Sequence, residues 1–484
     1  MRPLRAHPTP ADRSSPREGL SMDIDTVSPR AETPLDEEEL ADAGRARRES
    51  LPRSAHAEYT PPAGRDPLGI LATQHEARLQ SLVDLRVERM SADAFSFYRG
   101  TAAIQSADLA GGPTTGTEVV VCGDAHLSNF GMFRSPENAM VFDINDFDEA
   151  TVGPWEWDLK RLLGSVVIAG RSLGAAEPDL VGIEEDAASA YRDWLARTLR
   201  HSLRERYFRP TSVNERHRRL HPETERMIQE VARASGKRTS QRVAKRALEP
   251  DGAGGLRFVD RPPILQRAEE EIRDLADAAF QRYRATVPPN VALLLSQYRL
   301  VDVARRVVGV GSVGTRCFIL ALRGPADETL ILQLKEAGTS VVEQFGGVAP
   351  LPGYLDPELF PAQQGYRVVA CQRILQAVSD PFLGFLAERG FTFYMRLFRN
   401  RNASFEIGTM SPVQFSDYAR VCAVVLARAH ARSPKAAFVS GYLGSGDAFP
   451  RAVARWSSAY ADQAERDFAT FVEAARDGRF TVAA

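Results

Sequence analysis

The spacing of apolar residues predicts strands and helices along most of the chain. Residues 119–121 are three consecutive valines, which is typical of a buried strand, and two further strands are expected at 130–133 and 139–144 around a turn. Later strands are predicted at 317–322 and 330–335, with a hairpin over 382–398 that turns at 388–390. Helical spacing of apolar residues predicts helices from residue 66 and over 157–169, 185–250, 269–276, 365–379 and 411–431.

These elements divide the chain into five predicted segments. Residues 1–64 are rich in Pro, Ser, Arg and Glu and poor in large apolar side chains, so we expect a disordered tail. Residues 65–170 carry polar loops, 171–300 are expected to be helical, 301–400 hold most of the later strands, and 401–484 are the C-terminal helices. The expected fold class is α+β.

Polar residues gather where the first strands end. Asp124 and Asn129 follow the first strand, and Asp146 follows the third. Because loops at neighbouring strand ends can converge, these side chains are expected to meet on one ligand. An Asp followed five residues later by an Asn suits phosphoryl transfer, in which the Asp orients a hydroxyl and the Asn holds magnesium. The sequence therefore predicts Asp124 as a catalytic residue and Asn129 and Asp146 as Mg²⁺ ligands, with substrate phosphates and water completing the coordination.

A glycine-rich run follows much later in the chain. Its members are Gly309, Gly311, Ser312 and Gly314, in a G-x-G-x-x-G pattern. In dinucleotide-binding folds this pattern opens a helix, but here strand, turn and strand follow, and the second strand ends at Lys335. That order is typical of the small lobe of a kinase, in which the glycines cover ATP and the lysine contacts its α- and β-phosphates. A solvent-exposed lysine at a strand end is the simpler alternative.

Three further predictions concern charged residues near these motifs. Kinases pair the strand lysine with a helix glutamate, and Glu343 is the predicted partner of Lys335, with Glu336 and Glu358 as alternatives. Arg99 could reach a phosphate or an activation-segment carboxylate, but a surface or structural ion pair is the expected role. In the helix over 157–169, helical spacing predicts that Lys160 and Arg161 point away from the apolar face.

The first motif resembles the catalytic loop of aminoglycoside and choline kinases, whose pattern is G-D-x-H-x-x-N. The matching residues here are Gly123, Asp124, His126 and Asn129. Those enzymes also carry an Asp-aromatic pair, then a Gly and an Asp at fixed distances, which correspond here to Asp146, Phe147, Gly153 and Asp158. The resemblance implies that Asp158 supports the catalytic loop and that His126 is a structural histidine. The interval from Asn129 to Asp146 is longer than usual, so Asp143 stays an alternative metal ligand.

Longer stretches are similar to a bacterial family of uncharacterised proteins, the domain of unknown function 2252. They are FSFYRG (95–100), CGDAHLSNFG (122–131), VFDINDFDEATVGPWEWDLKRL (141–162), VVGVGSVGTR (307–316), LQLKEA (332–337) and LARAHARS (426–433). Membership implies kinase-like motifs but no substrate.

The order of the motifs differs from that of a kinase. The helix over 411–431 resembles the one that leads into a kinase catalytic loop. Here, however, the loop with Asp124 lies far upstream of that helix, and it also precedes the glycine run. We therefore expect a two-lobed, protein-kinase-like fold that is circularly permuted and carries helical elaborations. Permutation is tolerated when the original termini lie close together and the cut falls in an exposed segment.

Net charge, cysteine spacing and hydrophobicity limit the kinds of partner and compartment that we expect. A net charge of −2 argues against a nucleic acid, which usually leaves a basic footprint. The four cysteines are far apart in sequence, which suits a reducing compartment, and no apolar run predicts a signal sequence or a membrane span, so a cytoplasmic protein is expected. The expected partners are a nucleotide and an unknown small-molecule or protein hydroxyl acceptor.

The sequence thus predicts a phosphotransferase that uses ATP and Mg²⁺. Two alternatives stay open. A catalytically inactive, kinase-like module would keep the same motifs for nucleotide binding. A metal-dependent phosphoesterase would use the Asp124-x-His126 pair, but it needs further histidine ligands in a pattern that the eight histidines do not show.

Overall fold

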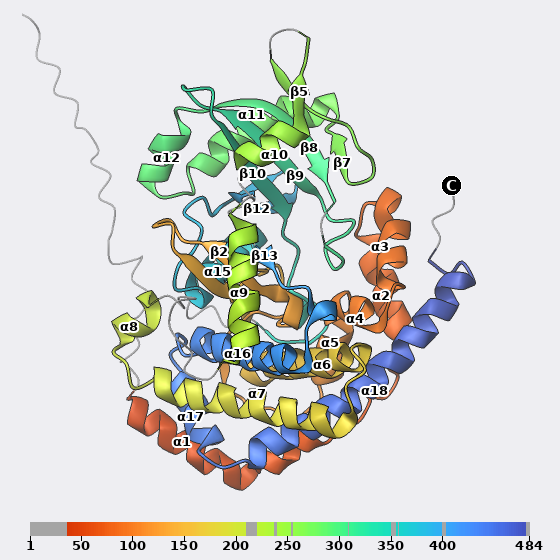
Figure 1. Cartoon of the computed structure of the whole chain (residues 1–484), viewed down its shortest axis with the longest axis vertical. Helices are drawn as coiled ribbons and strands as arrows, with labels where there is room; N and C mark the ends of the chain where they lie inside the picture. Colours follow the sequence, from red (N-terminus) through yellow and green to blue (C-terminus); the bar gives the residue numbers. More distant parts are fainter. Residues whose placement is uncertain are drawn as a thin grey trace, which may run out of the picture. The chain divides into compact units, whose positions relative to one another are not determined.

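The computed structural model describes residues 36–209, 220–236, 240–252, 255–307, 309–349, 355–356, 358–398 and 403–480. Residues Glu37–Ala484 form one compact unit. Figure 1 shows its β-rich part at the top and its helix-rich part below.

The β-rich part is built on a six-stranded antiparallel sheet with the strand order β11-β12-β10-β9-β8-β7. The strands span Leu265–Arg267 (β7), Arg299–Arg306 (β8), Cys317–Arg323 (β9), Thr329–Glu336 (β10), Gly384–Glu388 (β11) and Phe391–Leu397 (β12). Because successive side chains of a strand face opposite sides, β9 supplies both faces of the sheet. Phe318 and Leu320 pack in one buried cluster with α11 (Glu270–Arg284) and α12 (Pro289–Leu295). Ile319 and Ala321 pack in another with α10 (Ser240–Ala247).

The predicted hairpin over 382–398 is confirmed as β11 and β12. Its loop is Arg389-Gly390, and both residues have positive φ, at 49° and 81°. Two central residues of this kind are required by a type I′ turn, whose twist matches that of the strands it joins.

The helix-rich part surrounds α6, the helix predicted over 157–169, which extends over Trp155–Ser172. Three long helices pack around it, namely α7 (Glu177–Thr198), α16 (Pro412–His430) and α18 (Ala448–Arg476). The start of α16 is a capping box in which the Ser411 hydroxyl accepts from the backbone of Gln414 and the Gln414 side chain accepts from the backbone of Ser411. Two small sheets complete the core: β1 (Glu118–Val121) pairs with β4 (Thr151–Pro154), and β2 (Phe130–Arg134) lies between β3 (Met140–Ile144) and β13 (Ala403–Ser404).

Helix α15 (Gln364–Leu375) connects the two parts, since it contacts β11 and β12 on one side and β1 and β4 on the other. The fully buried Arg367 guanidinium of this helix donates to the backbone carbonyls of Asp148, Ala150 and Gly338. It thereby fixes the segment after Asp146 against the end of the six-stranded sheet.

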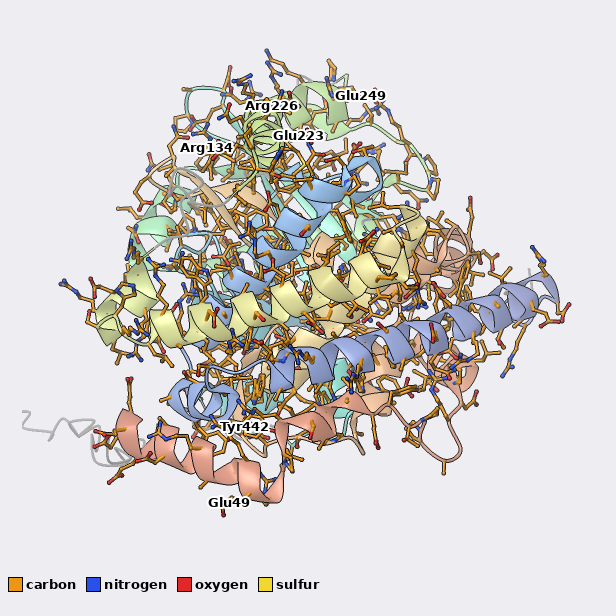
Figure 2. All side chains as sticks on the ribbon, turned by 60° about the horizontal axis from the view of Figure 1, so that its bottom comes forward. Glu49, Arg134, Glu223, Arg226, Glu249 and Tyr442 are labelled. Carbon is orange, nitrogen blue, oxygen red and sulfur yellow. The ribbon has the colours of Figure 1, made fainter. Side chains whose placement is uncertain are left out.

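The predicted tail is wrong for residues 37–64, while residues 1–35 lie outside the described part. Helix α1 (Glu37–Ser50) packs closely on α17 (Ala436–Leu443), as Figure 2 shows near the labelled Tyr442. A Cβ at Gly44 would lie 2.1 Å from the Phe438 carbonyl oxygen, and one at Gly441 would lie 2.1 Å from that of Ala41. The two backbones therefore meet through glycines, a contact that needs no large apolar side chain.

The remaining elements cover the site and its borders. Four short helices precede β1: α2 (Pro67–Glu76), α3 (Val83–Met90), α4 (Ala94–Arg99) and α5 (Ala102–Leu109). The segment predicted to be helical over 171–300 also holds α8 (Leu203–Phe208) and α9 (Pro222–Ser235), but strands β5 (Leu248–Pro250), β6 (Leu256–Phe258) and β7 interrupt it. Helices α13 (Val341–Gln344) and α14 (Leu359–Ala362) follow the sheet. Among the described residues, no helix is both long enough and apolar enough to cross a bilayer.

Candidate functional site

The loop over 123–129 is held in place from α6 and α16. Both carboxylate oxygens of the buried Asp158 accept backbone N–H bonds, from Cys122 at 2.6 Å and from Gly123 at 2.9 Å. His430 Nε2 lies 3.1 Å from the same carboxylate. Gly123 has a φ of +77°, and a Cβ there would lie 2.1 Å from the Glu149 carbonyl oxygen. The loop and the segment after Asp146 therefore touch through backbone at a position that only glycine fits.

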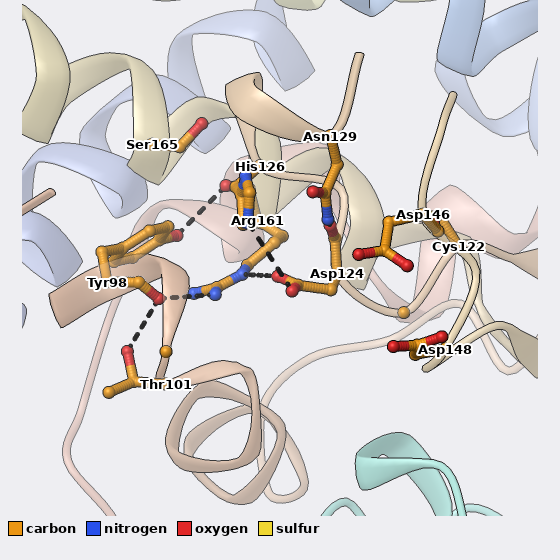
Figure 3. A network of polar contacts seen from close by, with 12 residues as sticks. Tyr98, Thr101, Cys122, Asp124, His126, Asn129, Asp146, Asp148, Arg161 and Ser165 are labelled. Atoms are coloured by element: carbon orange, nitrogen blue, oxygen red, sulfur yellow. Dashed lines mark hydrogen bonds and ion pairs between the residues drawn. The ribbon is translucent and has the colours of Figure 1, made fainter. Parts of the chain in front are cut away.

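Asp124 is bound to a buried arginine. Arg161 Nε donates to Asp124 Oδ1 at 2.8 Å, and another guanidinium nitrogen donates to the Tyr98 carbonyl (Figure 3). The third nitrogen donates to the Gln105 side chain. Helical spacing places Lys160 and Arg161 away from the apolar face of α6, yet both residues are buried. The side of α6 that carries Arg161 is covered by α4 and α5, which helical spacing alone does not reveal.

Asn129 and Asp146 face the space beside Asp124. Asn129 Nδ2 donates to the Asp124 carbonyl at 2.7 Å, and this bond fixes which end of the carboxamide is nitrogen and leaves Oδ1 available as an oxygen ligand. Asp146 Oδ1 is buried and has no hydrogen-bond partner among the described residues. Figure 3 shows both side chains next to Asp124. One amide oxygen and one unsatisfied carboxylate oxygen fit Mg²⁺, which takes few protein ligands when phosphates supply the others.

Two observations limit the choice of metal ligands. Asp143 lines neither of the cavities described below, and it lies buried near Arg428 and Arg432, with its carboxylate accepting from the Ile144 N–H. Asp143 therefore lies outside both cavities, whereas Asp146 lines both. Within the described ranges, no three His, Cys, Asp or Glu side chains come together as a ready metal site.

Lys335 meets the acidic segment from the opposite side. Its Nζ lies 2.6 Å from Asp148 Oδ2 and 3.7 Å from Asp146 Oδ1, and Asp148 Oδ1 accepts from the Tyr394 hydroxyl at 2.7 Å. Lys335 is 2% exposed, so it is not a solvent-exposed strand-end lysine. Lys335 on β10 and Tyr394 on β12 are direct cross-strand partners, which explains why both reach one carboxylate.

The predicted pairing of Lys335 with Glu343 is wrong. Glu343 Oε1 accepts instead from the Thr151 hydroxyl at 2.5 Å. The two alternatives fail as well, since Glu336 pairs with Arg316 and Glu358 lies on the exposed start of α14. Asp148 pairs with Lys335 because the chain after Asp146 turns back across the end of β10. Glu343 does not, because its helix, α13, packs against β4 and α5.

The glycine run is anchored by the helices that precede β1. Gly309 and Gly314 have positive φ, at 66° and 91°. Arg89 Nη1 donates to the Gly309 carbonyl at 2.6 Å, and the Leu79 N–H donates to the Gly314 carbonyl at 2.8 Å. Both bonds are accepted by carbonyl groups, so they hold the glycine run near Asp124 and Asp146 without using its backbone N–H groups.

Two cavities meet at this point. The first, which we call the loop cleft, has a volume of about 350 Å³ and is lined by Asp124, Asn129, Asp148, Arg78 and Arg99. The second, the strand cavity, has a volume of about 470 Å³ and is lined by Lys335, Arg396 and the apolar side chains of Ile264, Val307, Leu397 and Phe398. Asp146, Gly309 and Ser312 line both. A part-apolar cavity therefore adjoins a polar cleft at the Asp146 carboxylate and the glycine run.

Burial and neighbouring charges shift the pKa values of the site in different directions. Burial raises the pKa of Asp124, and the adjacent Arg161 opposes this. Burial and the negative charge of Asp148 raise the pKa of Asp146. Burial also opposes ionisation of Asp148, but Lys335 and Tyr394 outweigh it and lower the pKa of Asp148. For Lys335, burial would lower the pKa, yet Asp146 and Asp148 raise it. At neutral pH the Lys335–Asp148 pair is therefore charged.

Sequence reasoning missed four residues of this site, namely Asp148, Arg161, Arg367 and Tyr394. The sequence could have indicated Asp148, since this residue stands in the same acidic run as Asp146. His126, predicted as a structural residue, is buried with Nε2 at 3.7 Å from Asp124 Oδ2. Arg99 was predicted in an ion pair, yet the described residues contain no carboxylate within ion-pair distance of it, and it lines the loop cleft.

Comparison with known proteins gives one match. A family model described as "Uncharacterized protein conserved in bacteria (DUF2252)" matches residues 78–474, which include the 123–129 loop, Asp146, the glycine run and Lys335. No curated protein and no solved structure matches the chain.

Proposed function

The chain belongs to the DUF2252 family of uncharacterised bacterial proteins, and from its candidate site we propose that it is an ATP- and Mg²⁺-dependent phosphotransferase acting on a hydroxyl acceptor. The observation that carries this proposal is the contact between two segments far apart in sequence. Lys335, which follows the glycine run, lies 3.7 Å from Asp146, which faces the 123–129 loop. A lysine, a glycine run, an Asn and two Asp residues around two adjoining cavities are the parts that phosphoryl transfer requires.

In this proposal the nucleotide base occupies the strand cavity. The apolar side chains of Val307, Leu397 and Phe398 suit a purine, and the triphosphate then extends past Ser312 and Lys335 toward Asp146. Lys335 would leave Asp148 in part to contact the α- and β-phosphates. Mg²⁺, when bound by Asn129 and Asp146, would neutralise charge on the β- and γ-phosphates.

The acceptor would enter through the loop cleft. The ionised Asp124 carboxylate orients the acceptor hydroxyl and takes its proton, while the hydroxyl oxygen forms a bond to the γ-phosphorus. The bond between the γ-phosphorus and the bridging oxygen breaks, and ADP leaves with that oxygen. Arg161 keeps Asp124 oriented through a bond of 2.8 Å, so it acts as a positioning residue.

The same residues support a kinase-like fold with permuted segments. The glycine run, β9, β10 and Lys335 follow one another as in a kinase small lobe, and α15 lies between the sheet and the acidic loops. The 123–129 loop and Asp146 precede all of these in the chain. The phosphoesterase alternative has weaker support, because no cluster of three metal-binding side chains occurs in the part of the chain that the structure describes.

The test is nucleotide turnover by the full chain with Mg²⁺ and γ-labelled ATP, alone and with acceptor mixtures. We expect Asp124→Asn to lower turnover by about 10²–10⁴-fold with little change in ATP affinity, and Lys335→Met to weaken both. Equal turnover by wild type and Asp124→Asn would reject the catalytic assignment. Wild-type nucleotide binding without transfer to any acceptor, including the protein itself, would favour an inactive nucleotide-binding module.

A further inference from the structure

Two arginines in the loop cleft have no carboxylate partner among the described residues. Arg99 ends α4, and Arg78 follows α2 and donates through Nη1 to the Val313 carbonyl. The Nε atoms of both side chains are buried and make no hydrogen bond within the described chain. Both side chains are only partly exposed, and a partly buried cation without a carboxylate partner is costly, so such groups usually mark a ligand site or a structural network.

Most of the acidic residues around them are paired within the chain, and Asp146, which also lines the loop cleft, is assigned to Mg²⁺ in the proposed function. Asp124 pairs with Arg161, Asp148 with Lys335, and Glu336 with Arg316. Glu149 accepts from the Val341 N–H, and burial raises its pKa to about 7, so part of its population is neutral at physiological pH. The positive charges of Arg78 and Arg99 are therefore left for a negatively charged ligand to neutralise.

The two guanidinium groups lie on the acceptor side of the site. The charges that act on Arg99 include those of Asp124 and Asp146, which flank the position of phosphoryl transfer. Those acting on Arg78 are Glu149, Glu336 and Asp148. Both arginines line the loop cleft, and neither lines the strand cavity assigned to the base. Burial lowers the pKa of Arg78 to about 10, so it still carries its charge at neutral pH.

We propose that the acceptor is an anionic hydroxyl compound, whose carboxylate or phosphate group binds Arg78 and Arg99 while its hydroxyl faces Asp124. This inference rests on the proposed function, because it names the substrate class of that site. Guanidinium groups match carboxylate and phosphate oxygens in geometry as well as charge. A cationic amino alcohol would instead bring its charge next to both arginines.

The experiment measures binding of inorganic phosphate to the full chain by calorimetry, with Mg²⁺ and a saturating β,γ-imido analogue of ATP. The analogue fills the γ-phosphate position, so phosphate must use another site. We expect phosphate to bind wild type and choline not to bind, and Arg99→Gln and Arg78→Gln each to weaken phosphate binding by about tenfold or more. Arg455→Gln is the control, since Arg455 is an exposed arginine of α18 that lines neither cavity, and the phosphate affinity of this variant should stay within about twofold of wild type.

Several outcomes would overturn the inference. One is phosphate binding that is equal in wild type and in the Arg78→Gln and Arg99→Gln variants, and another is choline binding in place of phosphate. Phosphate binding with ADP that vanishes with the imido analogue would assign the arginines to the γ-phosphate instead. Failure of the proposed function would give a different result, because the ATP analogue itself would then not bind. Phosphate binding measured without nucleotide would still report on Arg78 and Arg99.

Discussion

The ion pair between Lys335 and Asp148 gives the most specific prediction, because the sequence favoured Glu343 as the partner. At 2.6 Å and an effective dielectric constant of about 20, the attraction is about 6 kcal/mol before desolvation is subtracted. Removing one member of a buried pair typically costs about 3–5 kcal/mol, since the other charge is left buried. Asp148 has 24% of its side chain exposed and Asp146 stays near Lys335, so we expect about 3 kcal/mol for Asp148→Ala.

A double-mutant cycle isolates the pair. If Lys335→Met and Asp148→Ala each lower the free energy of unfolding by about 3 kcal/mol, the double variant should lose no more than about 4 kcal/mol, which gives a coupling of about 2 kcal/mol. The control cycle combines Lys335→Met with Glu343→Gln, which keeps an acceptor for the Thr151 hydroxyl. Its coupling should stay below about 0.5 kcal/mol.

The assay is equilibrium urea unfolding of the ligand-free chain at neutral pH, followed by circular dichroism and tryptophan fluorescence. The sign with pH follows from the lowered pKa of Asp148, because the stabilisation is present above the pKa of the unfolded chain and is lost as pH falls through the lower value of the folded chain. A coupling of Lys335 to Glu343 that exceeds its coupling to Asp148 would refute this assignment.

Three further predictions follow from single positions. Burial raises the pKa of Asp143 to about 6, so this carboxyl favours the folded state at low pH, and that contribution is lost as pH rises through 6. Asp143→Asn should remove about 1.4 kcal/mol of the difference in unfolding free energy between pH 5 and pH 8, measured by urea unfolding. An unchanged pH profile would contradict the buried position of Asp143. Asp158→Ala leaves the Cys122 and Gly123 N–H groups without their acceptor and should cost about 3 kcal/mol or more, so a wild-type urea midpoint would disprove the support role. Gly123→Ala should lower the thermal midpoint more than Gly174→Ala, which has a similar φ of 75° but no atom within 4 Å of its Cβ, and equal shifts would show that contact with Glu149 does not matter.

Much of the local structure could be predicted because local chemistry determines it. The capping box at Ser411 and the two-residue turn at Arg389-Gly390 depend on residues within a few positions of each other. The strands β9 and β10 follow from runs of β-branched and aliphatic residues. The sequence positions of Asp124, Asn129, Asp146 and Lys335 were likewise visible in their spacing, and the structure brings these four residues to adjoining cavities.

The failures concern contacts between distant segments. Helical spacing places Arg161 away from the apolar face of α6, but it does not reveal that α4 and α5 cover that side of the helix. Composition suggested a tail up to residue 64, but α1 packs closely on α17, with Gly44 against the Phe438 carbonyl and Gly441 against the Ala41 carbonyl. The choice of Glu343 followed a pattern in which a helix glutamate faces the strand lysine, whereas here the acidic segment itself reaches Lys335.

The most direct test of the central claim is a structure of the full chain with Mg²⁺ and the imido analogue of ATP. We predict a purine in the strand cavity beside Leu397 and Phe398, phosphates between the Gly309–Gly314 run and Lys335, and a metal ion on Asn129 and Asp146. A nucleotide bound elsewhere, or no bound nucleotide at saturating concentration, would contradict it.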